Sequence, residues 1–145
     1  MKYSLQLDLD LPRERVLELF DNPDNMKEWQ PGLVSYEHLG GEPGQVGATA
    51  KLVYKMGKRD VEMIETVTHR NLPDEFFGSY EAKGVYNYIE NRFTELDANT
   101  TRWDFYTEFK MTGFMKVMGW IMPGSFKKQS FKFMKLFKEF AEKAE

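Results

Sequence analysis

The chain has 145 residues, a formal net charge of −3 and no cysteine. A chain of this length suits one domain that can bury a sizeable core, so we expect a single domain over residues 1–145. The mildly acidic charge argues against nucleic acid as a partner, because nucleic-acid-binding domains usually carry a basic surface. The lack of cysteine excludes disulfides and cysteine-based metal sites.

The composition predicts a soluble protein of the cytoplasm. Apolar residues make up 41% of the chain and charged residues 30%, a balance typical of folded globular domains. No apolar run approaches the ~20 residues that a membrane-spanning helix needs. The longest, from Gly113 to Met122, contains Lys116 and stops at Pro123. The first residues lead directly into a strand pattern and do not resemble a signal peptide.

The first part of the chain predicts one strand and two short helices. Apolar side chains occupy every second position from Lys2 to Asp10, which is typical of a strand with one face in solvent. Pro12 to Phe20 carries an apolar stripe, and proline is well tolerated in the first helical turn. Pro23 to Trp29 predicts a second short helix that ends before the Pro31-Gly32 pair.

From Leu33 onward the apolar pattern changes to a period of two. Tight turns such as Gly57-Lys58 separate the segments, so neighbouring strands are expected to pair antiparallel. In the third of these segments the alternation places Val61, Met63, Glu65, Val67 and His69 on one face. The six predicted strands are Leu33–Leu39, Ala48–Met56, Asp60–Arg70, Glu75–Ala82, Val85–Leu96 and Thr100–Met111.

The last third of the chain is rich in phenylalanine and methionine. Met111 to Phe140 holds six of the twelve phenylalanines and five of the nine methionines, and Pro123-Gly124 divides it. A short Met-rich helix before this pair would form either a lid or a plug at the end of the sheet. After the pair a long amphipathic helix is predicted. Its apolar side comprises Phe126, Ser130, Phe133, Phe137, Phe140 and Ala144, opposite Lys128, Lys132, Lys135 and Glu139.

The predicted fold is of the α+β class, with the order β-α-α-β-β-β-β-β-β-α. Seven strands joined mostly by tight turns predict one curved antiparallel sheet around the long C-terminal helix. Each buried phenylalanine contributes roughly 1.5–3 kcal/mol only where water is excluded, so this helix needs a concave partner. A sheet that grips a Phe/Met-rich helix favours a pocket for an apolar molecule.

Several local signatures occur in a characteristic order. They are Pro12–Phe20, Asp21–Gly32, Gly44–Gly47 before an apolar strand, Glu65–Val67 leading to Leu72-Pro73, and Thr100–Trp103 at the start of the last strand. Together they resemble the polyketide cyclase/dehydrase and lipid-transport group of the START-like superfamily (SRPBCC). The resemblance covers nearly the whole chain and implies a helix-grip fold, shared with the birch-pollen allergen, with a hydrophobic cavity between sheet and helix. It implies no shared catalytic motif, since members use the cavity for transport, cyclisation, hydrolysis or chaperone-related binding.

Glu65 is the charged residue of most interest. It shares a strand face with Met63 and Val67, which is expected to be the concave face. Burying a carboxylate costs several kcal/mol unless a partner or water satisfies it. Such a group would orient a polar part of a ligand or act as a base with a raised pKa. The alternative is a shifted register that places Glu65 in solvent and Ile64 inside.

The other candidate ligand-binding residues are apolar side chains or side chains with one polar tip. A pocket of this kind combines apolar walls with a few placed hydrogen-bonding groups. An alternative interpretation of Trp103 is a core residue that does not contact the ligand. With Glu65, the candidates are Leu52, Tyr54, Met63, Tyr80, Asn87, Trp103, Phe105, Met115, Met118, Phe126, Ser130, Phe133 and Phe137.

Neither a metal nor a cofactor is expected. His38 and His69 are the only histidines, and their spacing matches no metal-binding motif. The glycine-rich segment from Gly40 to Gly47 is followed by a strand and contains Glu42, whereas a phosphate-binding loop precedes a helix. It is interpreted as a hairpin connection.

Three functions remain open at this point. The first is binding or transport of a small hydrophobic or amphipathic ligand, and the second is a cyclase/dehydratase-like enzyme that uses Glu65 with Tyr54 or His69. The third is a peripheral membrane or protein-interaction module. The sequence favours no oligomeric state. The basic surface of the third hypothesis comprises Lys127, Lys128, Phe131, Lys132, Lys135 and Lys138.

Overall fold

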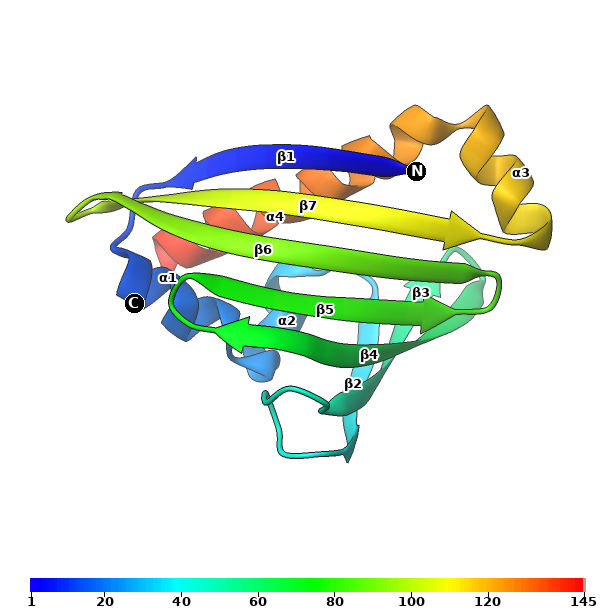
Figure 1. Cartoon of the computed structure of the whole chain (residues 1–145), viewed down its shortest axis with the longest axis horizontal. Helices are drawn as coiled ribbons and strands as arrows, with labels where there is room; N and C mark the ends of the chain where they lie inside the picture. Colours follow the sequence, from blue (N-terminus) through cyan, green and yellow to red (C-terminus); the bar gives the residue numbers. More distant parts are fainter. Residues whose placement is uncertain (145) are drawn as a thin grey trace.

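The chain folds into one seven-stranded sheet that curves around a long helix (Figure 1). The computed structural model describes residues 1–144, apart from the side chain of Pro123. In chain order the elements are β1 (Lys2–Leu9), α1 (Arg13–Phe20), the 3-10 helix η1 (Pro23–Asn25), α2 (Met26–Trp29), β2 (Leu33–Gly40), β3 (Thr49–Met56), β4 (Arg59–Asn71), β5 (Glu75–Ala82), β6 (Val85–Asp97), β7 (Thr100–Met111), α3 (Gly113–Ile121) and α4 (Pro123–Lys143).

The sheet has the strand order β1-β7-β6-β5-β4-β3-β2, with every neighbouring pair antiparallel. Strands β2 to β7 therefore follow one another as hairpins, and β1 adds to the last of them. In Figure 1, α4 lies behind the sheet, α1 and α2 lie near its lower edge, and α3 lies beyond one end. The predicted α+β helix-grip architecture is confirmed. None of the described helices has the length and apolarity needed to cross a bilayer.

The segment from Pro23 to Trp29 differs from its prediction as a single helix. It forms one 3-10 turn followed by one α-helical turn. The Asn22 side chain accepts a hydrogen bond from the backbone N–H of Asp24, 3.0 Å away, and Pro23 fixes the first turn. These local contacts start the 3-10 turn, and the chain then continues as α2.

One predicted alternation in β4 is wrong. Val67 pairs with Gly78, but a register shift follows and His69 pairs with Phe77. An extra residue in one strand reverses the faces of all residues beyond it. His69 therefore lies on the convex face, where its ring is 4.7 Å from that of Phe77. The Arg70 guanidinium donates two hydrogen bonds to the Asp21 carboxylate, with distances of 2.9 and 2.7 Å.

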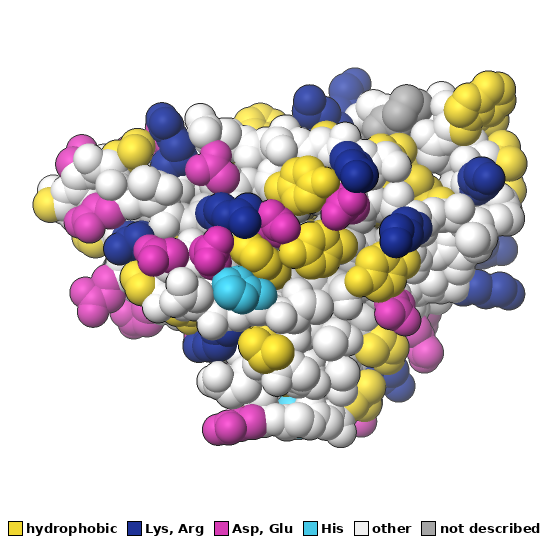
Figure 2. Space-filling view, viewed as in Figure 1, with side chains coloured by type: hydrophobic (Ala, Val, Ile, Leu, Met, Phe, Trp, Pro, Cys, Tyr) yellow, Lys and Arg dark blue, Asp and Glu magenta, His cyan; other side chains and the backbone are white. Residues whose placement is uncertain are grey.

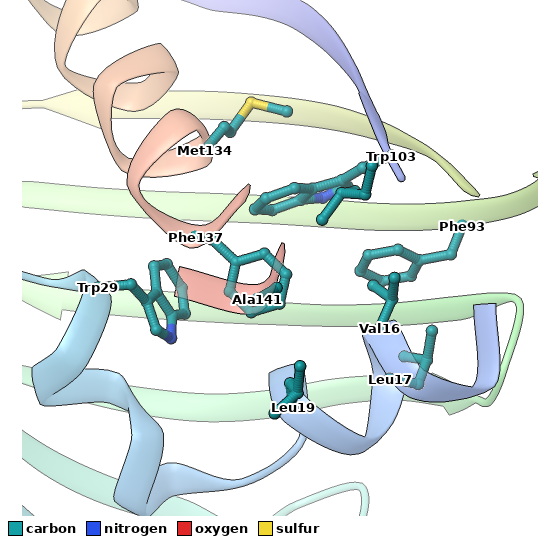
Figure 3. Close-up of a cluster of buried hydrophobic side chains, with 10 residues drawn as sticks. Val16, Leu17, Leu19, Trp29, Phe93, Trp103, Met134, Phe137 and Ala141 are labelled. Atoms are coloured by element: carbon teal, nitrogen blue, oxygen red, sulfur yellow. The ribbon is translucent and has the colours of Figure 1, made fainter. Parts of the chain in front are cut away.

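An aromatic cluster joins α1, α2 and α4 to the sheet. The Phe137 ring of α4 is fully buried and meets Trp29, Phe20 and Trp103 edge-on, with ring centroids 5.1, 5.6 and 5.5 Å apart. Figure 3 shows this ring between the side chains of α2 and those of the sheet. Edge-to-face pairs add roughly 0.5–1.5 kcal/mol each to the stabilisation from burial. This cluster therefore fixes α4 against the sheet.

The buried stripe of α4 is rotated from the predicted one. Met134, Phe137 and Ala141 are its deepest residues, and only Phe137 belonged to the predicted apolar side. The three recur at intervals of three and four, which defines one helical face. Helix α4 packs between β1 on one side and α2 on the other. The residues that face these two elements are therefore the most buried ones. Five residues of the predicted side are only partly buried: Phe126, Ser130, Phe133, Phe140 and Ala144.

Replacing Phe137 with alanine is expected to lower the free energy of unfolding by about 3–5 kcal/mol, because it removes a fully buried ring. Phe114→Ala on α3 is a matched control, since that side chain is exposed, and should change stability by less than about 0.5 kcal/mol. Urea unfolding of both variants measures the difference. Equal losses would contradict the role of the aromatic cluster.

Candidate functional site

A glutamate and three tyrosines form a polar group on the concave face of the sheet. Glu65 of β4 lies directly opposite Ala50 of β3 and Tyr80 of β5. Ala50 and Val67 share its face and are buried, so the carboxylate points into the domain. Tyr54 of β3 and Tyr36 of β2 complete the group, and burial, followed by the negative charge of Glu65, raises the pKa of both phenols. We call these four residues the Glu65 cluster.

Burial controls the protonation of the cluster. It raises the pKa of Glu65, while a hydrogen bond from the Tyr80 hydroxyl stabilises the carboxylate and opposes this effect. The pKa of Tyr80 is raised well above its usual value, first by burial and then by the negative charge of Glu65. Burial and the negative charge of Glu65 also raise the pKa of Tyr36 and Tyr54. All three phenols therefore remain protonated hydrogen-bond donors at neutral pH.

The carboxylate of Glu65 interacts with tyrosine hydroxyl groups and not with a cationic side chain of the described residues. Within residues 1–144 it forms no ion pair. The Tyr54 hydroxyl donates to the side-chain oxygen of Gln30, at the end of α2. A Cβ atom at Gly78 would lie 4.0 Å from the Tyr80 hydroxyl oxygen, so the tyrosine ring extends along the strand past the glycine. The tighter restriction at Gly78 comes from the Thr66 carbonyl oxygen, which would lie 3.2 Å from such a Cβ atom.

The Glu65 cluster is deep in the domain but not sealed. Glu65 and Tyr80 are enclosed by protein on most sides, yet both keep part of their surface accessible to solvent. Tyr36, Tyr54 and the neighbouring Met63 are also partly accessible. The side chains of this cluster are therefore not completely shielded from water.

Asn87 extends the polar group to β6, a fifth strand. It lies opposite Tyr80 on β6, so Asn87, Tyr80 and Glu65 form a row across three adjacent strands. The amide of Asn87 donates to the Thr107 hydroxyl at 2.6 Å and to the Glu108 carbonyl at 3.0 Å. These bonds hold its side chain against β7.

The remaining predicted residues lie in three other places. Leu52, Trp103 and Phe137 are buried against protein side chains, and Phe105 packs at the edge of the aromatic core. The Tyr3 hydroxyl donates to the carbonyl of Phe126 at 3.0 Å and lies 2.7 Å from the Ser130 hydroxyl. That pair attaches the start of α4 to β1. Three more predicted residues, all partly exposed on α3 and α4, are Met115, Met118 and Phe133.

Sequence reasoning missed Tyr36, Gln30 and the indole of Trp29. A register shift between Leu33 and Ser35 places Tyr36 beside Leu33, so regular alternation could not find it. Among residues 1–144, the Trp29 Nε1 atom is buried with no hydrogen-bond partner. No sequence pattern reveals this position of the indole N–H.

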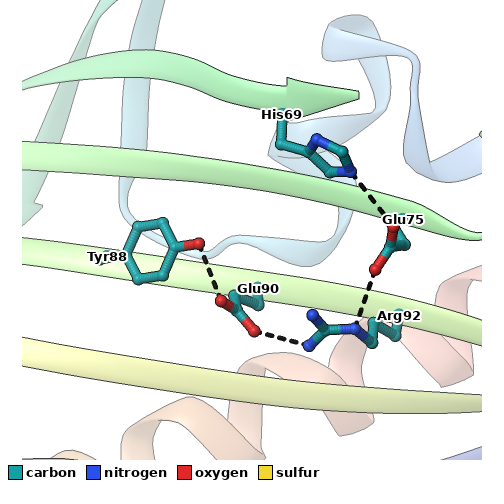
Figure 4. A network of polar contacts seen from close by, with 5 residues as sticks. All are labelled: His69, Glu75, Tyr88, Glu90 and Arg92. Carbon is teal, nitrogen blue, oxygen red and sulfur yellow. Dashed lines mark hydrogen bonds and ion pairs between the residues drawn. The ribbon is translucent and has the colours of Figure 1, made fainter. Parts of the chain in front are cut away.

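A second polar network lies on the convex face, away from the Glu65 cluster (Figure 4). Glu75 joins His69, 3.2 Å away, to Arg92, 3.0 Å away. Glu90 then joins Arg92 to the Tyr88 hydroxyl, 2.8 Å away, and burial with this bond raises the pKa of Tyr88 to about 12. The network connects three strands in the sheet. Because His69 belongs to it, His69 cannot act together with Glu65 as an acid/base pair.

The sequence matches one protein family over almost its full length. The family model described as "Polyketide cyclase / dehydrase and lipid transport" matches residues 2–137. No curated protein sequence matches this chain.

Solved structures with the same fold share little sequence with the chain. The Zhui aromatase/cyclase from Streptomyces sp. R1128 superimposes with a TM-score of 0.80 at 13% identity, over 98% of this chain and 93% of that one. Norcoclaurine synthase from Thalictrum flavum, in complex with dopamine and hydroxybenzaldehyde, gives 0.75 at 12% identity, over 100% and 88%. Ara h 8.0201 gives 0.77 at 10% identity, over 99% of both chains. At these identities the likeness establishes the fold alone.

The raised pKa of Glu65 predicts a specific pH dependence of stability. The folded state binds this proton more tightly than the unfolded chain does, so the stabilisation is present at low pH and is lost as pH rises from 4.5 through the folded pKa. Relative to wild type, Glu65→Gln should therefore become more stable by about 1.4 kcal/mol for each pH unit in that window.

Urea unfolding at several pH values between roughly pH 4 and 8 measures this difference. Glu81→Gln is the control, because Glu81 is exposed on the opposite face of the neighbouring strand. Parallel stability profiles for wild type and Glu65→Gln would show that the carboxyl titrates normally.

Proposed function

The chain belongs to the polyketide cyclase/dehydrase and lipid transport family, and from this premise we propose that it binds a small hydrophobic or amphipathic ligand between the sheet and α4. The Glu65 cluster would hold the polar end of the ligand. The apolar part would lie along the concave face toward the first half of α4.

The observation that carries this proposal is the Glu65 cluster. A carboxylate enclosed by protein, with tyrosine hydroxyls and no cation around it, costs stability. Replacement by a hydrophobic residue would remove that cost, so folding alone does not explain the arrangement. Ligand sites combine apolar walls with a few placed polar groups, and the partial accessibility of Glu65 and Tyr80 fits such a site.

The chemistry of the cluster indicates what it would recognise. The protonated Tyr36 hydroxyl can donate a hydrogen bond to a carbonyl or hydroxyl oxygen. The hydroxyl oxygens of Tyr54 and Tyr80, which donate to Gln30 and Glu65, and the Glu65 carboxylate can accept hydrogen bonds from a hydroxyl group. Met63, partly accessible beside them, supplies an adaptable apolar contact. A phenolic or hydroxylated aromatic compound combines these features. The dopamine and hydroxybenzaldehyde bound by the norcoclaurine synthase are of this kind and are suitable first probes.

An enzymatic role is the second candidate, favoured by the contact of Glu65 with Tyr80. A buried carboxylate with a raised pKa is a stronger base when it ionises, and a tyrosine hydroxyl can polarise a carbonyl oxygen. Glu65 would remove a proton next to the carbonyl group while Tyr80 stabilises the oxygen that gains charge. His69 has no part in this reaction because it lies on the convex face.

Glu65→Gln should weaken the binding of a hydroxylated aromatic ligand by about tenfold or more, because it removes a hydrogen bond to a charged acceptor. Native mass spectrometry of the freshly purified protein first identifies any bound molecule by a mass that disappears on denaturation. Calorimetry with that molecule, or with the phenolic probes, then compares wild type with Glu65→Gln.

The same variants separate a carrier from an enzyme. Glu81→Gln removes a carboxylate from the opposite face and should bind as wild type does. Loss of turnover by about 10²–10⁴-fold with little change in affinity would support the enzyme. Unchanged binding of every probe by Glu65→Gln would refute a role for the cluster in either function.

A further inference from the structure

Helix α3 is apolar on two opposite sides. Gly119 is buried against the end of the sheet, with Met115 and Met118 partly buried beside it. The outward side carries Trp120, Phe114 and Ile121, which are 84%, 74% and 61% exposed. A helix that is hydrophobic all round is normally enclosed by protein or lipid. Residues 1–144 leave one side of α3 uncovered.

The inner side of α3 packs closely against the end of the sheet. A Cβ atom at Gly119 would lie 2.5 Å from the methyl carbon of Met111, and one at Gly84 would lie 3.4 Å from Met115. The helix backbone therefore already contacts the sheet. The outward residues need a different partner if they are to leave water.

Positive charge is concentrated around this helix. The stretch 109–138 contains seven lysines, whereas all 23 acidic residues of the chain lie outside it. Lys116, Lys127, Lys128 and Lys132 are exposed and form no ion pair within the described residues. In Figure 2, hydrophobic side chains lie at the surface of the end where Figure 1 places α3, with Lys or Arg side chains beside them.

We propose that α3 and the first turns of α4 form a docking surface for an anionic lipid membrane. The exposed apolar side chains would enter the boundary between head groups and acyl chains, and the lysines would lie at the level of the lipid phosphates. Trp120 suits this boundary because its ring is apolar and its N–H is polar. The proposal goes beyond ligand binding and does not depend on it.

A second copy of the chain fits this surface less well. A two-fold symmetric contact through α3 would bring the same patch of each copy together. The lysines of one copy would then face those of the other, and like charges repel. An anionic lipid surface satisfies both the apolar stripe and the lysines.

The tryptophans provide a direct test. Trp29 and Trp103 are buried, so Trp120 is the one tryptophan that reports on the solvent side of α3. On adding phosphatidylcholine vesicles that contain phosphatidylserine, we expect a blue shift of the emission and quenching by brominated acyl chains. Both should be weaker without phosphatidylserine and in high salt, because salt screens exposed charges.

Two variants separate insertion from attraction. Lys127→Glu with Lys128→Glu should weaken sedimentation with these vesicles by about tenfold or more, given roughly 1 kcal/mol for each lysine at an anionic surface. The control is the double variant Lys55→Glu with Lys58→Glu at the exposed β3–β4 turn, which changes the net charge by the same amount. It should bind the vesicles more strongly than the double variant of Lys127 and Lys128. Phe114→Ser with Ile121→Ser should also reduce binding, whereas Val46→Ser in the loop before β3 should not.

Three results would overturn the proposal. They are the absence of vesicle binding in low salt, binding with no change in Trp120 emission, and a concentration-dependent blue shift in buffer without vesicles. The last of these would assign the surface to self-association.

Discussion

The position of α4 depends on the insertion of Phe137 into the aromatic cluster. The ring meets Trp29 of α2, Phe20 of α1 and Trp103 of β7, so one side chain links both N-terminal helices to the sheet. Because this contact fills the space under β1, β7 and β6 near the C-terminal half of α4, tight packing is concentrated there. The Glu65 cluster lies on β2 to β5, outside this aromatic cluster, and keeps accessible surface.

The two regions make opposite contributions to stability. Burial of aromatic rings stabilises the folded state, whereas burial of Glu65 favours its protonated form and destabilises the ionised one. A domain with a strongly packed aromatic core can tolerate such groups on its concave face. Their location away from most of the ring contacts is what a binding site on a rigid scaffold requires.

The sequence predicted the strands and their antiparallel order, because the alternation is regular over most of each strand, as it is in β4 as far as Val67. It left the direction of Glu65 open between the concave face and solvent. It failed where a register shift changes the faces, at His69 and near Tyr36, since such a shift depends on pairing with a distant strand. The helical pattern of α4 found Phe137 but not Met134 or Ala141, because the rotation of a helix is set by its neighbours. The amphipathic pattern also gave no sign of exposed apolar residues on α3, where both sides are apolar.

Charge segregation gives the proposed docking an orientation. A chain with net charge −3 is repelled as a whole by an anionic surface, but the seven lysines of residues 109–138 make the region of α3 and α4 locally attractive. Electrostatic attraction would therefore select the only orientation in which the apolar side of α3 also faces the lipid. Lys138 is held away from that surface by its bonds to the Asp8 carbonyl and Glu142, at 2.8 and 2.6 Å. The basic patch is thus strongest at the start of α4, where Phe126 and Ser130 attach the helix to β1, and this is the end of the concave face that would lie nearest the membrane.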